Sequence, residues 1–144
     1  MMNSTCRLSE GIITLPQGYH AQTLNTLTDQ HELLPTFTIS RDTLGSHNNV
    51  IDYIDHQLST LEKRYRRWQQ SLHELAVLGD NLTSGITVTF NFTQDDKIAV
   101  YQKQAFFTLN MEDLLIFSLS KASPLTADDV QRFSDTLKSF QLYA

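Results

Sequence analysis

The stretch IAVYQKQAFF, residues 98–107, has the alternation of a β-strand with a polar interruption on an otherwise apolar face. Successive side chains of a strand point to opposite faces. One face therefore carries Ile98, Val100, Gln102, Gln104 and Phe106, and the other carries Ala99, Tyr101, Lys103, Ala105 and Phe107. The two glutamines offer hydrogen-bond donors and acceptors without charge. Such side chains suit a surface that is mainly apolar and still has to form hydrogen bonds with polar groups.

Further strands surround this one. The run GITVTFNFT, residues 85–93, alternates cleanly, and the turn QDDK joins it to residues 98–107 as a hairpin. We also expect strands in SLHELAVLGD, residues 71–80, and in DLLIFSLSK, residues 113–121. Before the helices, the pattern predicts three short strands, at Ile12–Leu15, Gln22–Thr28 and Thr36–Arg41.

Two helices complete the pattern. The first is predicted over Val50–Gln70, capped by Asn48 or Asn49, with an apolar stripe at three- and four-residue spacing: Ile51, Ile54, Leu58, Leu61, Tyr65 and Trp68. The second follows SPLTADD, where Thr126 and Asp129 resemble a capping box; its inner stripe is Val130, Phe133 and Leu137, extended by Phe140. The order predicts a single α+β domain over residues 1–144, a twisted, largely antiparallel sheet with both helices packed on it.

The composition fits a globular chain of one domain. Its 144 residues are 40% hydrophobic and carry a net charge of −5, which allows a core and disfavours a nucleic-acid partner. The single cysteine, Cys6, cannot form an internal disulfide. Because the N-terminus has no apolar signal region and no apolar run approaches ~20 residues, we expect a soluble cytoplasmic protein without direct membrane insertion.

Catalytic motifs are missing from the sequence. The five histidines are scattered without metal-site spacing, and there is no glycine-rich phosphate loop or nucleophile elbow. We therefore predict no catalytic residue, no metal site and no cofactor, and a protein that is not an enzyme. An enzyme whose site is assembled from distant positions remains a third alternative.

Other strands share the mixed polar and apolar character of residues 98–104. Residues 22–28 place Leu24 and Thr26 on one face with Gln22, and residues 36–41 place Thr36, Thr38 and Ser40 together. On the long helix, Gln57 flanks the apolar stripe near Leu61. Two interpretations stay open: an ordinary solvent-facing sheet, or a docking surface for an apolar partner whose backbone still forms hydrogen bonds.

A family resemblance favours the second interpretation. The run LSEGIITLPQGYHAQTLNTL, residues 8–27, resembles the opening of DcrB-related proteins of PsbP-like fold and, more narrowly, of the Eag chaperones of type VI secretion systems, through Glu10-Gly11, Leu15-Pro16, Gly18, Thr23 and Asn25. Further matches are ISRD at 39–42, DHQL at 55–58, YQKQ at 101–104 and LTADDVQRFSDTLKSF at 125–140, so that the resemblance spans residues 8–142. The chain departs from the pattern at Tyr19, Ala21, Gln22 and Thr26, where the family has Trp, Asp, Arg and an aliphatic residue.

The resemblance implies a cytoplasmic homodimer. Such a protein binds the N-terminal transmembrane helices of a PAAR- or Rhs-type effector and shields them until the effector is loaded on the secretion spike. By hypothesis, polar contacts come from Gln57, Gln102 and Gln104, apolar area from Leu24, Leu61, Ile98 and Val100, and close approach from Thr26, Thr38 and Ser40. The alternative is a non-catalytic interaction module of PsbP-like fold that binds a folded protein, such as a small GTPase or a photosystem-like complex.

Overall fold

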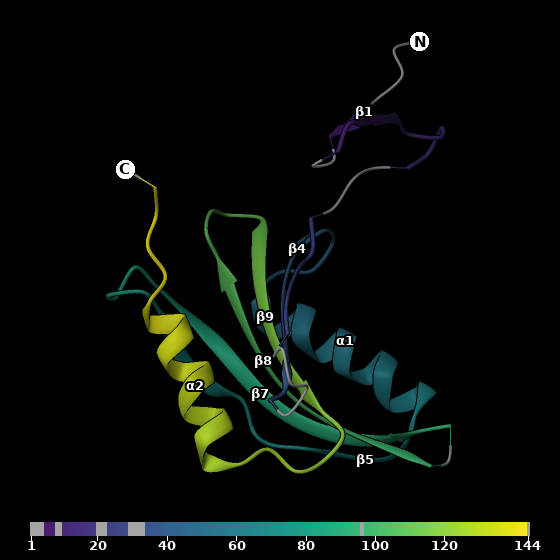
Figure 1. Cartoon of the computed structure of the whole chain (residues 1–144), viewed down its shortest axis with the longest axis vertical. Helices are drawn as coiled ribbons and strands as arrows, with labels where there is room; N and C mark the ends of the chain where they lie inside the picture. Colours follow the sequence, from purple (N-terminus) through teal and green to yellow (C-terminus); the bar gives the residue numbers. More distant parts are fainter. Residues whose placement is uncertain (1–4, 8–9, 20–22, 29–33, 96, 144) are drawn as a thin grey trace.

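The computed structural model describes residues 5–7, 10–19, 23–28, 34–95 and 97–143 (Figure 1). A two-stranded antiparallel hairpin comprises β1 (Thr5–Arg7) and β2 (Ile12–Thr14). The main antiparallel sheet has the order β3-β4-β9-β8-β7-β5, and β6 also pairs with β7. Its strands are β3 (Asn25–Leu27), β4 (Thr36–Thr43), β5 (Arg66–Gln70), β6 (Glu74–Leu78), β7 (Thr83–Gln94), β8 (Ile98–Thr108) and β9 (Asp113–Lys121). The helices are α1 (Val50–Arg64) and α2 (Ala127–Lys138).

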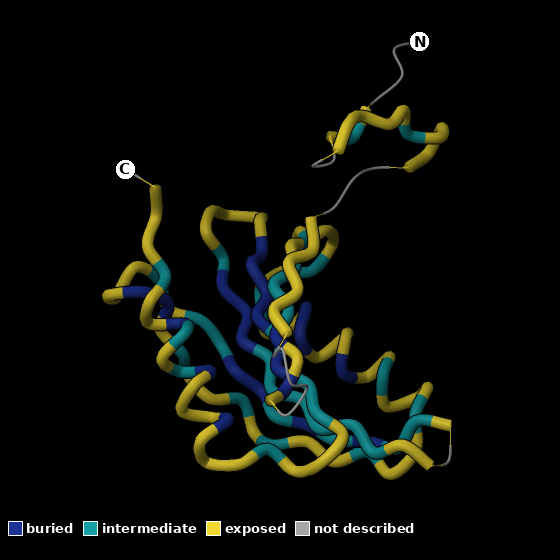
Figure 2. The backbone as a smooth tube through the Cα atoms, in the orientation of Figure 1, coloured by how far each residue is buried: buried dark blue, intermediate teal, exposed yellow. Residues whose placement is uncertain are grey.

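One helix covers each face of the sheet, which gives three layers (Figure 1). On the α1 side, Ile54 and Leu58 of the helix join a cluster with the alternate residues Val88, Phe90 and Phe106 of the sheet. On the α2 side, Phe133 and Leu137 of the helix join a cluster with the opposite set of strand residues: Phe37, Ala105, Phe107, Leu115 and Phe117. Burial is deepest where β7, β8 and β9 meet at the centre (Figure 2). The predicted α+β architecture with an antiparallel sheet is confirmed.

Helix α1 is shorter than its apolar periodicity predicts. It ends at Arg64, and residues 66–70 form strand β5 against β7. The prediction of a helix to Gln70 is wrong because Tyr65 leaves the helix with extended backbone and Arg67 has a φ of 55°. The spacing misled because Tyr65 and Trp68 still point to the α1-side core, where their rings stack on Phe92 and Phe90.

The ends and faces of the helices differ in part from the predicted stripes. Asn49 caps α1, and its side chain accepts a hydrogen bond from the Asp52 amide. The capping box of Thr126 and Asp129 on α2 is confirmed. Two predicted core residues are instead exposed, Ile51 on α1 and Val130 on α2, and the buried positions beside them are Tyr53 and Asp129. In each case the buried face is rotated by a fraction of a turn from the face that hydropathy alone selects.

Of the three strands predicted before the first helix, two are shorter than predicted and one is longer. The strand predicted at 12–15 is β2, whose partner β1 the sequence pattern did not reveal. The strand predicted at 22–28 is β3, over Asn25–Leu27, and Gln22 lies outside the described residues. Strand β4 runs two residues beyond the predicted end at Arg41. The predicted hairpin of β7 and β8 and the final strand β9 are as expected.

Candidate functional site: a hydroxyl–amide face beside helix α1

The strand register gathers short hydroxyls and long amides on the α1 side of the sheet. Thr26 pairs with Thr38, Thr38 with Ser118, and Ser118 with Gln104, which makes a row across four strands. A second row joins Thr36, Ser120 and Gln102. We define the hydroxyl–amide face as Thr26, Thr36, Thr38, Ser40, Gln102, Gln104, Ser118 and Ser120. These side chains carry no charge, so the face offers hydrogen bonding without ion pairing.

The two glutamines are held by serines of the neighbouring strand. The Gln104 side chain donates from Nε2 to Ser118 Oγ at 2.9 Å, and the Gln102 side chain donates to Ser120 Oγ at 3.4 Å. All four residues are half-buried. Because one amide proton of each glutamine is used within the sheet, the amide oxygen and the second proton stay available to a partner. These bonds tie the amides of β8 to the hydroxyls of β9.

Hydrogen bonds on the two flanks of α1 show which flank of the helix is turned toward β4 and the hydroxyl–amide face. The Tyr53 hydroxyl donates a hydrogen bond to the Asp42 carboxylate of β4. The pKa of Tyr53 is raised mainly by burial, and also by this hydrogen bond and the negative charge of Asp42. On the opposite flank, His73 before β6 contacts Asp55 at 2.9 Å. Gln57 lies one turn after Tyr53 on the β4 flank. It is exposed on this flank, and its contact with a partner stays a prediction.

Of the remaining predicted residues, Ile98 and Val100 lie on the same sheet face, whereas Leu61 and Leu24 lie outside it. Ile98, 55% exposed, and half-buried Val100 share the sheet face of Gln102 and lie against a hollow of about 520 Å³ that Thr36 and Ser120 also line. Leu61 packs on the α1-side core and contributes only its partly exposed edge. Leu24 is exposed just before β3, outside the strand ladder. The structure therefore brings Thr26, Thr38, Ser40, Ile98, Val100, Gln102 and Gln104 onto one sheet face, with Gln57 at its border.

Sequence reasoning missed the two serines at the centre of this face. Ser118 and Ser120 stand in β9 between the β4 hydroxyls and the β8 amides. Their signal was available, because Ile116, Ser118 and Ser120 alternate with Phe117 and Leu119 in DLLIFSLSK. The missing information was the strand order that places β9 between β4 and β8.

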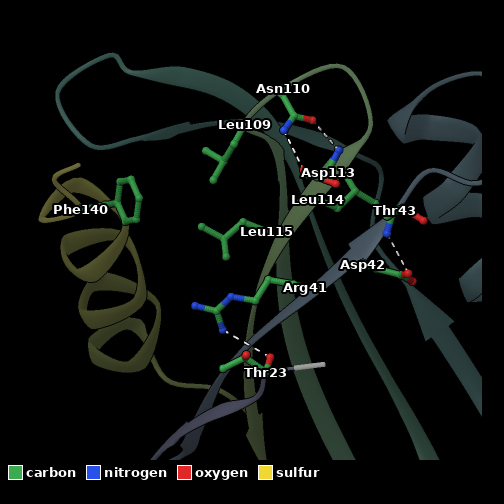
Figure 3. A pocket seen from close by; sticks show the side chains of 10 residues that line it. All are labelled: Thr23, Arg41, Asp42, Thr43, Leu109, Asn110, Asp113, Leu114, Leu115 and Phe140. Carbon is green, nitrogen blue, oxygen red and sulfur yellow. Dashed lines mark hydrogen bonds between the residues drawn. The ribbon is translucent and has the colours of Figure 1, made fainter. Parts of the chain in front are cut away.

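A second hollow lies on the α2 side of the sheet (Figure 3). It has a volume of about 610 Å³, and Leu109, Leu115 and Phe140 form much of its wall. The Arg41 guanidinium at its edge donates to Asn25 Oδ1 at 2.6 Å. None of the residues predicted to bind a partner lines this hollow.

The best-defined charged cluster belongs to α2. Asp129 is buried and accepts hydrogen bonds from Lys121 at 3.0 Å and Arg132 at 2.7 Å. Burial favours the neutral acid, but hydrogen bonds from Thr126, Lys121 and Arg132 outweigh it and lower the pKa of Asp129 to about 2. This cluster fastens the start of α2 to the end of β9. Within the described ranges, no three His, Cys, Asp or Glu side chains are grouped to hold a metal ion, and no helix has the length and hydropathy of a membrane span.

Solved structures share this architecture. A Pseudomonas aeruginosa protein of unknown function, described as a putative regulator, is similar over 99% of this chain and 98% of its own, with a TM-score of 0.63 and 16% identity. Cyanobacterial PsbP (CyanoP) from Synechocystis is similar over 92% of this chain and 86% of its own, with a TM-score of 0.56 and 18% identity. The fold is therefore PsbP-like.

The family follows from the sequence match. The DcrB family model matches residues 10–139, and the chain belongs to the DcrB family. No curated protein matches the chain significantly in sequence. Neither structural relative is described as an enzyme, and the shared features define a protein of DcrB type built on a PsbP-like sheet.

Proposed function

We propose that this protein is a chaperone that binds and shields the N-terminal transmembrane helices of a type VI secretion effector of PAAR or Rhs type. The observation that carries the proposal is the uncharged hydroxyl–amide face, bordered by Gln57 and continued by Ile98 and Val100. A partner for such a face is mainly apolar and also needs uncharged hydrogen-bonding groups.

A transmembrane helix in water meets both conditions. Its exposed apolar surface costs roughly 25 cal/mol per Å², so it aggregates or inserts in a membrane too early. Between membrane helices, small residues allow close approach and neutral polar side chains form hydrogen bonds. Thr38, Ser118 and Gln104 offer this combination from a rigid sheet.

The dimensions of the face suit a helix. Four neighbouring strands, β3, β4, β9 and β8, span about 14 Å at ~4.8 Å per strand, enough for a helix of ~10 Å diameter. The run from Ile98 to Gln104 is about 20 Å long at ~3.3 Å per residue, whereas a membrane-spanning helix is ~30 Å long. One copy thus covers about two thirds of such a helix, which favours action as a homodimer.

The finer assignment rests on the sequence resemblance to Eag chaperones. The motifs ISRD at 39–42 and YQKQ at 101–104 fall on β4 and β8, the strands that carry much of the proposed face. The proposal places the protein in the cytoplasm, where it holds the effector helices before loading on the secretion spike. It assigns the contacts to Leu24, Thr26, Thr38, Ser40, Gln57, Leu61, Ile98, Val100, Gln102 and Gln104, and adds Ser118 and Ser120.

Co-purification tests this function. The tagged protein is co-expressed with its genomic neighbours and purified without detergent, and bound proteins are identified by mass spectrometry. We expect a large effector with apolar N-terminal helices, whose binding is lost when those helices are deleted and kept when its C-terminal region is deleted. Recovery of a folded, water-soluble partner without such helices would contradict the chaperone function and favour an interaction module for folded proteins.

A further inference from the structure

The hollow on the α2 side of the sheet has the size and the lining of a small-molecule site. Its volume of about 610 Å³ lies in the range of roughly 300–1,000 Å³ that is typical of ligand pockets. Three different elements bring apolar side chains to it: Leu109 follows β8, Leu115 belongs to β9, and Phe140 follows α2 (Figure 3). We call these three residues the apolar wall. Leu109 is 49% exposed and Phe140 is half-buried, so an apolar ligand would gain by covering the wall.

Arg41 gives this hollow a permanent positive charge. It stands opposite Leu115 in the register of β4 and β9, and its guanidinium lies beside the apolar wall (Figure 3). Its Nη1 donates to Asn25 Oδ1 at 2.6 Å, and to the carbonyl oxygens of Ile39 at 3.3 Å and Thr23 at 3.4 Å. Among the described residues these are the partners of Arg41, and none of them is a carboxylate. The positive charge is therefore not neutralised, and Nη2 and Nε keep their protons for a ligand.

Two carboxylates near the hollow determine where an anionic group can bind. Asp42 accepts a hydrogen bond from Tyr53 of α1, so its carboxylate is turned to the opposite side of the sheet. Asp113 accepts from the Asn110 side chain at 2.7 Å. It lies two positions along the β4–β9 ladder from Arg41, about 7 Å at ~3.3 Å per residue. An anionic group is thus favoured at the Arg41 end of the hollow and disfavoured at the Asp113 end.

We propose that this hollow binds an aliphatic carboxylate of medium chain length, with the carboxylate on Arg41 and the hydrocarbon chain on the apolar wall. A guanidinium binds a carboxylate through two N–H groups at once. A hydrocarbon chain suits the wall because it needs no hydrogen bonds, whereas a peptide in the same place would leave backbone groups unpaired against apolar side chains. The site lies on the other side of the sheet from the hydroxyl–amide face, and the inference is independent of the proposed client.

Isothermal titration calorimetry of the full chain with decanoate tests the site. The titration contains no client and stays below the critical micelle concentration. We expect saturable binding of one decanoate per chain with a Kd below about 1 mM. Decanol, which lacks the charge, and decylammonium, which reverses it, should each bind at least about tenfold more weakly. Absence of saturable binding, or binding of decylammonium as tight as that of decanoate, would overturn the inference.

Two substitutions with matched controls locate the ligand. Arg41→Gln should raise the Kd for decanoate at least about tenfold, whereas Lys97→Gln, which removes the same charge at an exposed position in the β7–β8 turn, should not change it. Equal Kd values for wild type and the folded Arg41→Gln variant would overturn the role of the guanidinium.

The apolar wall is tested without disturbing the hydrogen bonds of Arg41. Leu109→Asp should also raise the Kd at least about tenfold, because a carboxylate in the wall repels the ligand and must lose its water. Met111→Asp is the control, since this position in the same turn is 92% exposed and lies outside the hollow. Both positions are exposed, so circular dichroism should show a native fold in each variant. Equal Kd values for these two variants would place decanoate elsewhere and overturn the site.

Discussion

The paired substitution of Gln102 and Gln104 by alanine should weaken client binding while leaving the fold in place. Each amide is half-buried and donates a hydrogen bond to a serine of β9. Hydrogen bonds between membrane helices contribute about 0.6 kcal/mol on average and up to about 1.7 kcal/mol. Loss of both amides should therefore cost about 1–3 kcal/mol of binding, which is about a 5- to 150-fold rise in Kd.

The free energy of unfolding should change less. The variant loses two side-chain hydrogen bonds of about 1 kcal/mol each at most, and the half-exposed Ser118 and Ser120 can bond to water instead. Thermal unfolding of the variant should remain cooperative, with a modest fall in Tm. A decrease in client binding therefore reports on the face itself, because the protein stays folded.

Fluorescence anisotropy provides the assay. A labelled client segment, taken from the co-purified effector, is titrated with the protein in detergent-free buffer. The matched control is Gln131→Ala on α2, where the amide also donates a hydrogen bond, to Asp135 at 2.8 Å, but lies on the other side of the sheet. Binding by the folded double variant within about twofold of wild type would refute the role of the amides.

Three further predictions concern the apolar end of the face, the acid cluster and the sheet interior. Ile98→Arg should weaken client binding at least about tenfold because the new charge must be desolvated, whereas Ile51→Arg, on the α1 flank facing away, should bind normally; equal titrations would contradict the site. Asp129 has a pKa lowered to about 2, so its stabilisation is complete above pH ~4 and is lost as the pH falls toward 2, an effect of about 2 kcal/mol. Urea unfolding between about pH 4 and 2 should show this loss of stability in wild type and not in Asp129→Asn. The same pH dependence of stability in both proteins would contradict the role of Asp129. Gly85→Ala places a Cβ 2.2 Å from the Phe106 carbonyl oxygen and should destabilise by more than about 2 kcal/mol, while Ser84→Ala should not; a Tm equal to wild type would contradict the packing.

The sequence contained most of the sheet and only part of the helices. Period-two alternation in residues 85–93, 98–107 and 113–121 predicted β7, β8 and β9 because both faces of these strands carry distinct sets of side chains. The end of α1 was missed since Tyr65 and Trp68 continue the helical spacing after the backbone has become extended. Periodicity reports where side chains point, and two kinds of backbone can point them alike.

The face beside α1 was predictable residue by residue but not as a surface. Alternation within β4 and β8 placed Thr38 with Ser40 and Gln102 with Gln104. It could not place the two pairs next to each other, because strand order and register arise from contacts far apart in the sequence. For the same reason, Ser118 was not predicted as part of the face. The exposure of the apolar residues of β6 was not predicted either, because it depends on which strand lies at the edge of the sheet.

Nuclear magnetic resonance of the client complex tests the central claim most directly. Side-chain amide signals of the glutamines are recorded in the 15N-labelled protein while an unlabelled client helix is added without detergent. The account predicts large shifts for Gln102, Gln104 and Gln57, and none for Gln131 on α2. Shifts confined to Gln131, or to residues around the hollow beside Arg41, would place the client on the opposite side of the sheet and contradict the account.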